Sequence, residues 1–193
     1  MPLRFTIPLV LSFVCFAVPA WADFQAGMDA TNREDYATAL REWRPLAEQG
    51  DALAQYNLGV LYRKGRGVPQ DDVQARQWYE KAAAQGQAKA QFNLGTLYFN
   101  GAGVQKDYRQ ALRWFRLAAD QGEALAQTKI AIMYDDGQGV PQDFVQAHKW
   151  YNLAATNGDK PAAELRDALA KQMTPAQIAE AQKLAREWKP IKK

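Results

Sequence analysis

The side chains that most often act as enzymatic nucleophiles are nearly absent from this chain of 193 residues. Its single serine, Ser12, and its single cysteine, Cys15, both lie close to the N-terminus. A serine or cysteine triad, or a serine β-lactamase, needs such a nucleophile beside a base. Beyond residue 22 the chain has neither residue type, so the sequence predicts no catalytic residues and favours a protein that is not an enzyme.

Three other features could hold a metal ion or a phosphate group. His148 is the only histidine, and one histidine without cysteine cannot provide a usual zinc set. We therefore predict that it is a partly exposed structural residue. The run from Asp135 to Gly137 resembles the start of a calcium loop, but the twelfth position is Gln146 rather than glutamate. The Gly-x-Gly pairs lack a third glycine and follow predicted helices, which is typical of a turn. The sequence thus predicts neither a metal nor a cofactor.

The first 22 residues have the pattern of a secretory signal peptide. A single arginine precedes an apolar run over residues 7–18, and Ala20 and Ala22 are small residues at the −3 and −1 positions of a cleavage site. The run is shorter than the about 20 residues that a transmembrane helix needs. We predict cleavage between Ala22 and Asp23, and a periplasmic or secreted mature chain that does not insert into a membrane.

The composition of the mature chain argues against two classes of partner. Its 171 residues, enough for one domain, carry 23 basic and 21 acidic side chains that are evenly scattered. Such a balance favours neither nucleic acid nor an anionic membrane surface. Because no cysteine remains, an oxidising compartment adds no disulfide.

Glycine recurs every 36 residues, at Gly50, Gly86, Gly122 and Gly158. In this register, residues 51–86, 87–122 and 123–158 are three copies of one pattern of alanine, leucine, tyrosine, glycine and tryptophan. A fixed period of this length indicates stacked supersecondary units, because one unit alone cannot bury its own apolar face.

Each copy is predicted to contain two helices. In the first copy, apolar residues spaced by four and three indicate a helix from about Ala52 to Arg63 that ends at Gly65. A second helix follows over residues 72–85, with Asp71 as N-cap and Gln74 completing a capping box. The same Asp-x-x-Gln recurs at Asp107/Gln110 and Asp143/Gln146.

The second helix pairs bulky and small side chains. We expect Trp78 and Tyr79 to fill the wedge between repeats, while Ala82 and Ala83 let the neighbouring helix approach closely.

The pattern Ala-x-x-x-Leu-Gly-x-Leu-Tyr-x-x-Gly-x-Gly-Val, continued by Asp-x-x-x-Ala-x-x-Trp-Tyr-x-x-Ala-Ala-x-x-Gly, runs from Ala54 to Gly86. It resembles the Sel1-like repeat family, whose members are relatives of the tetratricopeptide repeat. The resemblance covers Asp51 to Gly158. It implies an all-α fold, a right-handed α-solenoid of antiparallel helix pairs. Departures are mild: Ala131 replaces Gly59, and Gln105 stands where the other copies have proline.

The flanking segments differ from the repeats. Residues 23–50 form a shorter pair like an ordinary tetratricopeptide repeat, with Pro45 expected to kink or break its second helix near Trp43. Residues 159–193 are predicted to be C-terminal capping helices and a tail. Arg166 replaces the core leucine there, so no further repeat can dock, and Thr174 begins a final helix that ends at about Trp188.

In tetratricopeptide relatives the first helices line a concave groove, and the resemblance selects the positions that lie opposite the packing face here. They vary between copies and include three aromatics. Either these aromatics anchor a peptide, or Tyr56 and Phe92 only pack between adjacent first helices. The fifteen positions, hereafter the groove row, are Leu53, Tyr56, Val60, Arg63, Lys64, Lys89, Phe92, Thr96, Phe99, Asn100, Leu125, Thr128, Ile132, Asp135 and Asp136.

The sequence therefore favours an exported scaffold that binds another protein or peptide as a monomer or with weak self-association. The resemblance implies roles such as an envelope adaptor, a regulator of a membrane-bound signalling protein, or a factor presented to a host. Two alternatives remain open. One is a hydrolase acting on cell-wall or β-lactam substrates, which would need a deep pocket with a perturbed titratable pair. The other is a self-associating structural protein.

Overall fold

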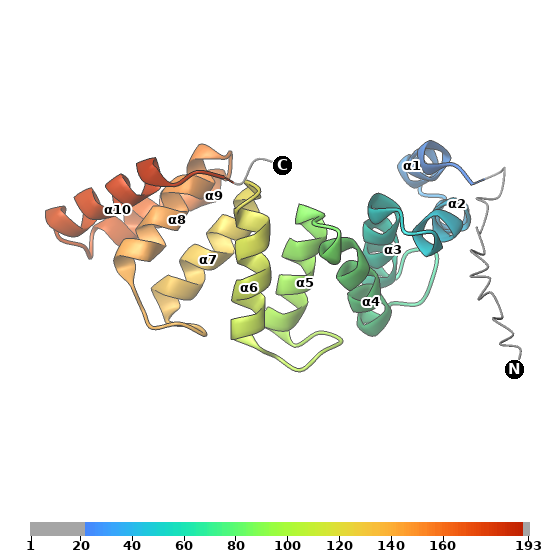
Figure 1. Ribbon diagram of the computed structural model, residues 1–193, viewed down its shortest axis with the longest axis horizontal. Helices are drawn as coiled ribbons and strands as arrows, with labels where there is room; N and C mark the ends of the chain where they lie inside the picture. The colour runs from blue at the N-terminus through green and yellow to red at the C-terminus, as the bar shows by residue number, and fades with distance from the viewer. Residues whose placement is uncertain (1–21, 191–193) are drawn as a thin grey trace, which may run out of the picture.

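The computed structural model describes residues 22–190, which form ten α-helices and contain no strand. The predicted signal peptide lies outside the described residues, apart from Ala22. Figure 1 shows the helices following one another from the N-terminal end to the C-terminal end. The predicted all-α solenoid of helix pairs is confirmed. The helices are α1 (Phe24–Asn32), α2 (Tyr36–Glu48), α3 (Ala52–Lys64), α4 (Asp72–Ala84), α5 (Ala88–Asn100), α6 (Tyr108–Ala119), α7 (Ala124–Asp136), α8 (Phe144–Thr156), α9 (Lys160–Ala170) and α10 (Pro175–Glu187).

The three 36-residue copies become the helix pairs α3/α4, α5/α6 and α7/α8. Each first helix ends, as predicted, at a glycine in the left-handed conformation, with φ of 63° at Gly65, 73° at Gly101 and 70° at Gly137. A side chain at these positions would be strained, because the left-handed region brings Cβ close to the following carbonyl oxygen.

The predicted capping box is half right. The Asp71 carboxylate accepts from the Val73 and Gln74 amides, and Asp107 caps its helix in the same way. The Asp143 carboxylate accepts from the Gln146 amide. The glutamine does not return a bond to the aspartate amide, because that N–H is already engaged. The aspartate amide donates instead to the carbonyl of the tyrosine near the end of the preceding helix. The distance is 3.0 Å from Asp71 N to the Tyr62 carbonyl and 2.9 Å from Asp107 N to the Tyr98 carbonyl. This bond ties the two helices of one repeat together.

The aromatic residue after the repeated tryptophan forms the centre of each pair. Tyr79 and Phe115 are buried, and their rings lie on the backbone of Gly59 and Gly95. A Cβ at Gly59 would come within 2.5 Å of the Tyr79 ring, so this glycine allows the close approach of the two helices. The expectation for Tyr79 is corrected, because its ring packs within one repeat. Trp78 is half-buried against the apolar cluster of α1, α2 and α3, with the Lys81 ammonium 4.1 Å from its ring centroid.

A buried amide ladder joins successive repeats. Gln55, Gln91 and Gln127 are buried at one position of the period. Each donates from Nε2 to a carbonyl near the end of the preceding second helix, as Gln91 does to Ala83 at 3.2 Å. Each also accepts from an amide at the end of its own second helix, as Gln91 does from Gln121 at 2.7 Å. The buried amides are thus satisfied across every repeat boundary.

The N-terminal pair is less irregular than predicted. The prediction was a kink or a break near Trp43; helix α2 continues through Pro45, so there is no break. Proline removes one backbone donor from the helix, but the helix is anchored on both sides of it, because Trp43 and Ala47 are buried.

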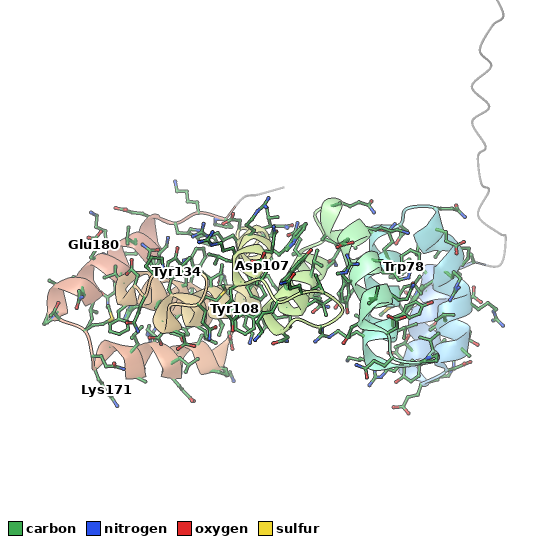
Figure 2. The ribbon with its side chains drawn as sticks, turned by 90° about the horizontal axis from the view of Figure 1, so that it is seen from below. Trp78, Asp107, Tyr108, Tyr134, Lys171 and Glu180 are labelled. Carbon is green, nitrogen blue, oxygen red and sulfur yellow. The ribbon has the colours of Figure 1, made fainter. Side chains whose placement is uncertain are left out.

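At the other end, α9 packs on α8 as a first helix would, with Ala162 and Leu169 buried. Helix α10 begins with the predicted capping box of Thr174 and Gln177. It also packs on α8, and its Trp188 ring lies 6.1 Å from that of Trp150. Figure 2 shows Lys171, at the end of α9, and Glu180, on α10, at opposite edges of this end. The last two helices thus both pack on the second helix of the last repeat.

Candidate protein-binding face

The groove row lies along α3, α5 and α7, and none of its fifteen side chains is buried. Nine members are half-buried: Tyr56, Val60, Arg63, Phe92, Thr96, Phe99, Thr128, Ile132 and Asp135. The members with the greatest exposure are Leu53, Lys64, Lys89, Asn100, Leu125 and Asp136. Leu53 and Leu125 are 50% and 51% exposed, which leaves two large apolar side chains in contact with water.

Tyr56 and Phe92, the two aromatics that could instead serve only to pack the repeats, lie against the second helix of their own repeat. The Tyr56 ring centroid lies 6.1 Å from that of Tyr79, and Phe92 lies 5.8 Å from Phe115. These ring contacts lie within a repeat, but Tyr56 also forms a side-chain hydrogen bond with Asn93 on the adjacent first helix, as the alternative explanation expects. Burial raises the pKa of Tyr56, and the negative charge of Glu123 adds to that shift.

Phe99 is the aromatic at the centre of the row. Its ring meets the edge of Tyr108 at 5.1 Å and lies 6.3 Å from Phe115. The Lys129 ammonium lies 5.6 Å from the Phe99 centroid, within the range of a cation–π contact. Lys129 is not in the predicted set, although it follows Thr128 directly, so a slightly wider helical face would have included it.

Charge changes sign along the ends of the three first helices. The equivalent pairs are Arg63-Lys64 on α3, Phe99-Asn100 on α5 and Asp135-Asp136 on α7. Lysine and arginine suit a helix C-terminus, where the macrodipole is negative, but an acidic pair opposes it. Burial raises the pKa of the Asp135 carboxyl, and the charge of Asp136 adds to this. The Tyr151 hydroxyl donates a hydrogen bond to the Asp135 carboxylate, which gives Asp135 a partner within its own repeat. Helix stability does not explain the exposed Asp136.

A separate open hollow lies beside the loop of the second copy. Its lining residues are Tyr98, Val104, Gln105, Lys106, Asp107 and Gln110. Its carboxylate, Asp107, accepts from the Arg109 and Gln110 amides at 2.9 and 3.0 Å as the cap of α6. Figure 2 labels this residue at the start of the helix. The cap explains the carboxylate without a ligand.

His148 does not have the expected partial exposure. It is buried, 3% exposed, on α8 beneath the C-terminal helices, and its Nδ1 has no hydrogen-bond partner among the described residues. Burial lowers its pKa, and the nearby Arg166 charge lowers it further, against an opposing effect of Asp167. The prediction failed because α9 and α10 cover a helix face that is open in a lone repeat.

The buried His148 should make stability depend on pH. Because its pKa is lower in the folded state, the unfolded chain binds the extra proton, and stability falls as pH drops through and below about 6.5. We expect the thermal midpoint to fall more between pH 7.5 and pH 5 in the native chain than in His148→Leu. Leucine occupies the equivalent positions 40 and 112. Equal decreases in the two proteins would show that His148 has the same pKa in the folded and the unfolded chain.

In residues 22–190 no group of three or more histidine, cysteine, aspartate or glutamate side chains is placed to hold a metal ion. Nor does any helix there have the length and apolar character required to cross a membrane.

Comparison with known proteins identifies the repeat. The Sel1 repeat model matches residues 52–87, 88–123 and 124–159, one residue later in each copy than the predicted boundaries. These matches cover more than half of the chain, which therefore belongs to the Sel1 repeat family. No curated protein matches the chain.

Two solved structures share this fold. A Sel1 repeat protein from Oxalobacter formigenes is 38% identical, with a TM-score of 0.69, over 72% of this chain and 58% of its own length. The protein c5321 is a protective antigen present in uropathogenic Escherichia coli strains. It is 32% identical, with a TM-score of 0.60, over 85% of this chain and 44% of its own length. The chain thus spans about half the length of both relatives.

Proposed function

We propose that this chain is an exported, non-enzymatic Sel1 repeat scaffold that binds a segment of another protein along the groove row. The observation that carries this proposal is the change from basic to aromatic to acidic residues at equivalent positions of three otherwise matching repeats. Packing fixes the alanine, leucine and glycine positions in every copy. Packing does not fix the exposed neighbours Lys64, Asn100 and Asp136, where the charge also changes from basic to acidic.

The charges of the row define the chemistry of the partner. A bound segment would carry acidic side chains toward Arg63 and Lys64, and basic side chains toward Asp135 and Asp136. Between them, an apolar or aromatic side chain would lie against Phe99. Complementary charge mainly sets orientation and specificity, while an aromatic anchor supplies a larger share of affinity.

Three further parts of the proposal rest on the sequence. Export follows from the signal-peptide pattern of residues 1–22, and it would deliver the mature chain to the periplasm or outside the cell. The lack of serine and cysteine after residue 22 supports a non-enzymatic role. An envelope adaptor, a regulator of a membrane-bound signalling protein, or a host-interaction factor all fit a secreted scaffold of this kind. The antigen description of c5321 is compatible with the last of these roles.

Site-specific photo-cross-linking in the producing cells tests the face directly. A photoreactive amino acid would replace Lys89 or Leu125, both exposed in the groove row, or Gln77 or Arg113, both exposed on second helices. We expect a discrete cross-linked protein from the first two positions and at least about tenfold less from the other two. Adducts from the second-helix positions alone would place the interface elsewhere. An adduct with twice the mass of the chain would instead indicate self-association.

A charge-swapped variant tests the role of the charged ends of the groove row in the same experiment. Lys64→Glu combined with Asp136→Lys changes two exposed side chains and leaves the net charge unaltered. We expect it to weaken the adduct at Lys89 while the thermal midpoint stays the same, because surface substitutions rarely change stability by more than about 0.5 kcal/mol.

A further inference from the structure

The N-terminal helix pair contains a buried carboxylate with little reason to be there in a purely structural role. Glu42 on α2 is 5% exposed, although glutamate is rarely buried unless it is paired. Its Oε1 accepts from Arg41 Nη2 at 3.0 Å, but the Arg41 side chain is 63% exposed. An exposed ion pair of this kind contributes little.

The other oxygen of Glu42 faces the point where the chain is predicted to be cut. Glu42 Oε2 accepts from the backbone nitrogen of Asp23 at 3.2 Å. Asp23 is the residue that cleavage after Ala22 would make the first of the mature chain. This nitrogen is an uncharged amide before cleavage. After cleavage the same atom is an α-ammonium, which is charged at neutral pH.

Several contacts hold this nitrogen in place without help from the preceding residues. Asp23 is the N-cap of α1, and its Oδ1 accepts from the Gln25 and Ala26 amides at 2.7 and 3.4 Å. The Trp43 indole N–H donates to the Phe24 carbonyl at 3.1 Å. The start of α1 is therefore ordered by its own cap and held to α2 at the residue next to the Asp23 nitrogen.

We propose that Glu42 is the receptor for the α-ammonium group that cleavage before Asp23 creates, so that removal of the leader strengthens the docking of α1 on α2. A free ammonium at the start of a helix opposes the macrodipole and needs a nearby carboxylate. In the processed chain, the amide–carboxylate hydrogen bond becomes a charge-assisted one. This inference rests on the export that we propose, but not on the groove row.

A double-mutant cycle tests the pairing. The chain is prepared from Asp23 and, as a comparator, from Ala22, which moves the ammonium one residue away from Glu42. Both forms contain all ten described helices. Each is studied with Glu42 and with Glu42→Gln, which keeps a hydrogen-bond acceptor but removes the charge. We expect Glu42→Gln to lower the thermal midpoint of the Asp23 form by about 2–4 °C more than that of the Ala22 form.

Two controls separate this result from general effects of charge or fraying. Glu48→Gln changes an exposed glutamate on the same helix and should lower both forms equally. Hydrogen exchange over residues 24–32 should be slower in the Asp23 form than in the Ala22 form when Glu42 is present, and equal when it is replaced.

The first residue of the exported protein, measured by mass spectrometry, completes the test. We expect Asp23. Another first residue would overturn both the cleavage site and this inference. A chain that begins at Asp23 but shows no coupling to Glu42 would overturn the inference alone and leave the proposed export standing.

Discussion

Replacing Ala119 with arginine is expected to lower the free energy of unfolding by at least about 3 kcal/mol. Ala119 is fully buried in the core formed by α6, α7 and α8, and its carbonyl accepts from Gln127 Nε2 at 3.2 Å. Overpacking a dense interior costs about 1–3 kcal/mol. A guanidinium without a partner in that interior adds a desolvation penalty, because a buried charge is tolerated only when it is paired.

Urea unfolding of Ala119→Arg, followed by circular dichroism, measures this effect. Leu117→Arg is the matched control, because it introduces the same side chain on the same helix at a position that is 47% exposed. We expect that control to change stability by no more than about 0.5 kcal/mol. A midpoint for Ala119→Arg equal to that of Leu117→Arg would show that the 119 position is not an interior contact.

The parts of the fold that follow from local chemistry could be predicted from the sequence. A glycine that ends a helix, or an aspartate that begins one, acts through its own neighbours, and the period repeats each signal three times. Gly65 and Asp71 were thus assigned to the correct ends of α3 and α4. Thr174 and Gln177 gave an equally local signal for α10.

Features that depend on contact between repeats could not be predicted in the same way. The bond from the Asp71 amide to the Tyr62 carbonyl requires the two helices to be packed already, so the local capping rule assigned that amide the wrong partner. His148 is buried by α9 and α10, which belong to no repeat. The buried glutamines share one position of the period, at Gln55, Gln91 and Gln127, but glutamine is a residue type that is mostly exposed, so its burial does not follow from the period.

For the candidate site, the sequence could predict which positions lie on the face but not how their side chains pack. Helical periodicity and the family resemblance select the exposed side of α3, α5 and α7, and the charges at its two ends are visible in the sequence. Which aromatic rings pack inward depends on side-chain directions: Phe99 contacts Tyr108 and Phe115, and Lys129 lies over its ring.

Substituting the second glycine of a Gly-x-Gly loop should also cause a large loss of stability. At this glycine one repeat touches the backbone of the repeat before it. Gly103 has a φ of 65°, and a Cβ there would lie 2.4 Å from the backbone of Asp72 at the start of α4. Its carbonyl also accepts from Arg76 Nε at 3.2 Å. Gly103→Ala should therefore cost about 2–5 kcal/mol, since a left-handed alanine and a backbone clash act together.

Gly122→Ala separates the two contributions. Gly122 has a φ of 86°, but nothing lies within 4 Å of a Cβ built there, so we expect only the conformational cost of about 1–2 kcal/mol. The clash at Gly103 should also have a consequence that Gly122→Ala lacks. In a repeat array, stability depends on each repeat and on its interface with the next. Weakening the interface between repeats 51–86 and 87–122 should broaden the urea transition of Gly103→Ala or split it in two. Equal losses and equally sharp transitions in both variants would mean that the loop yields to the methyl group and does not couple the repeats.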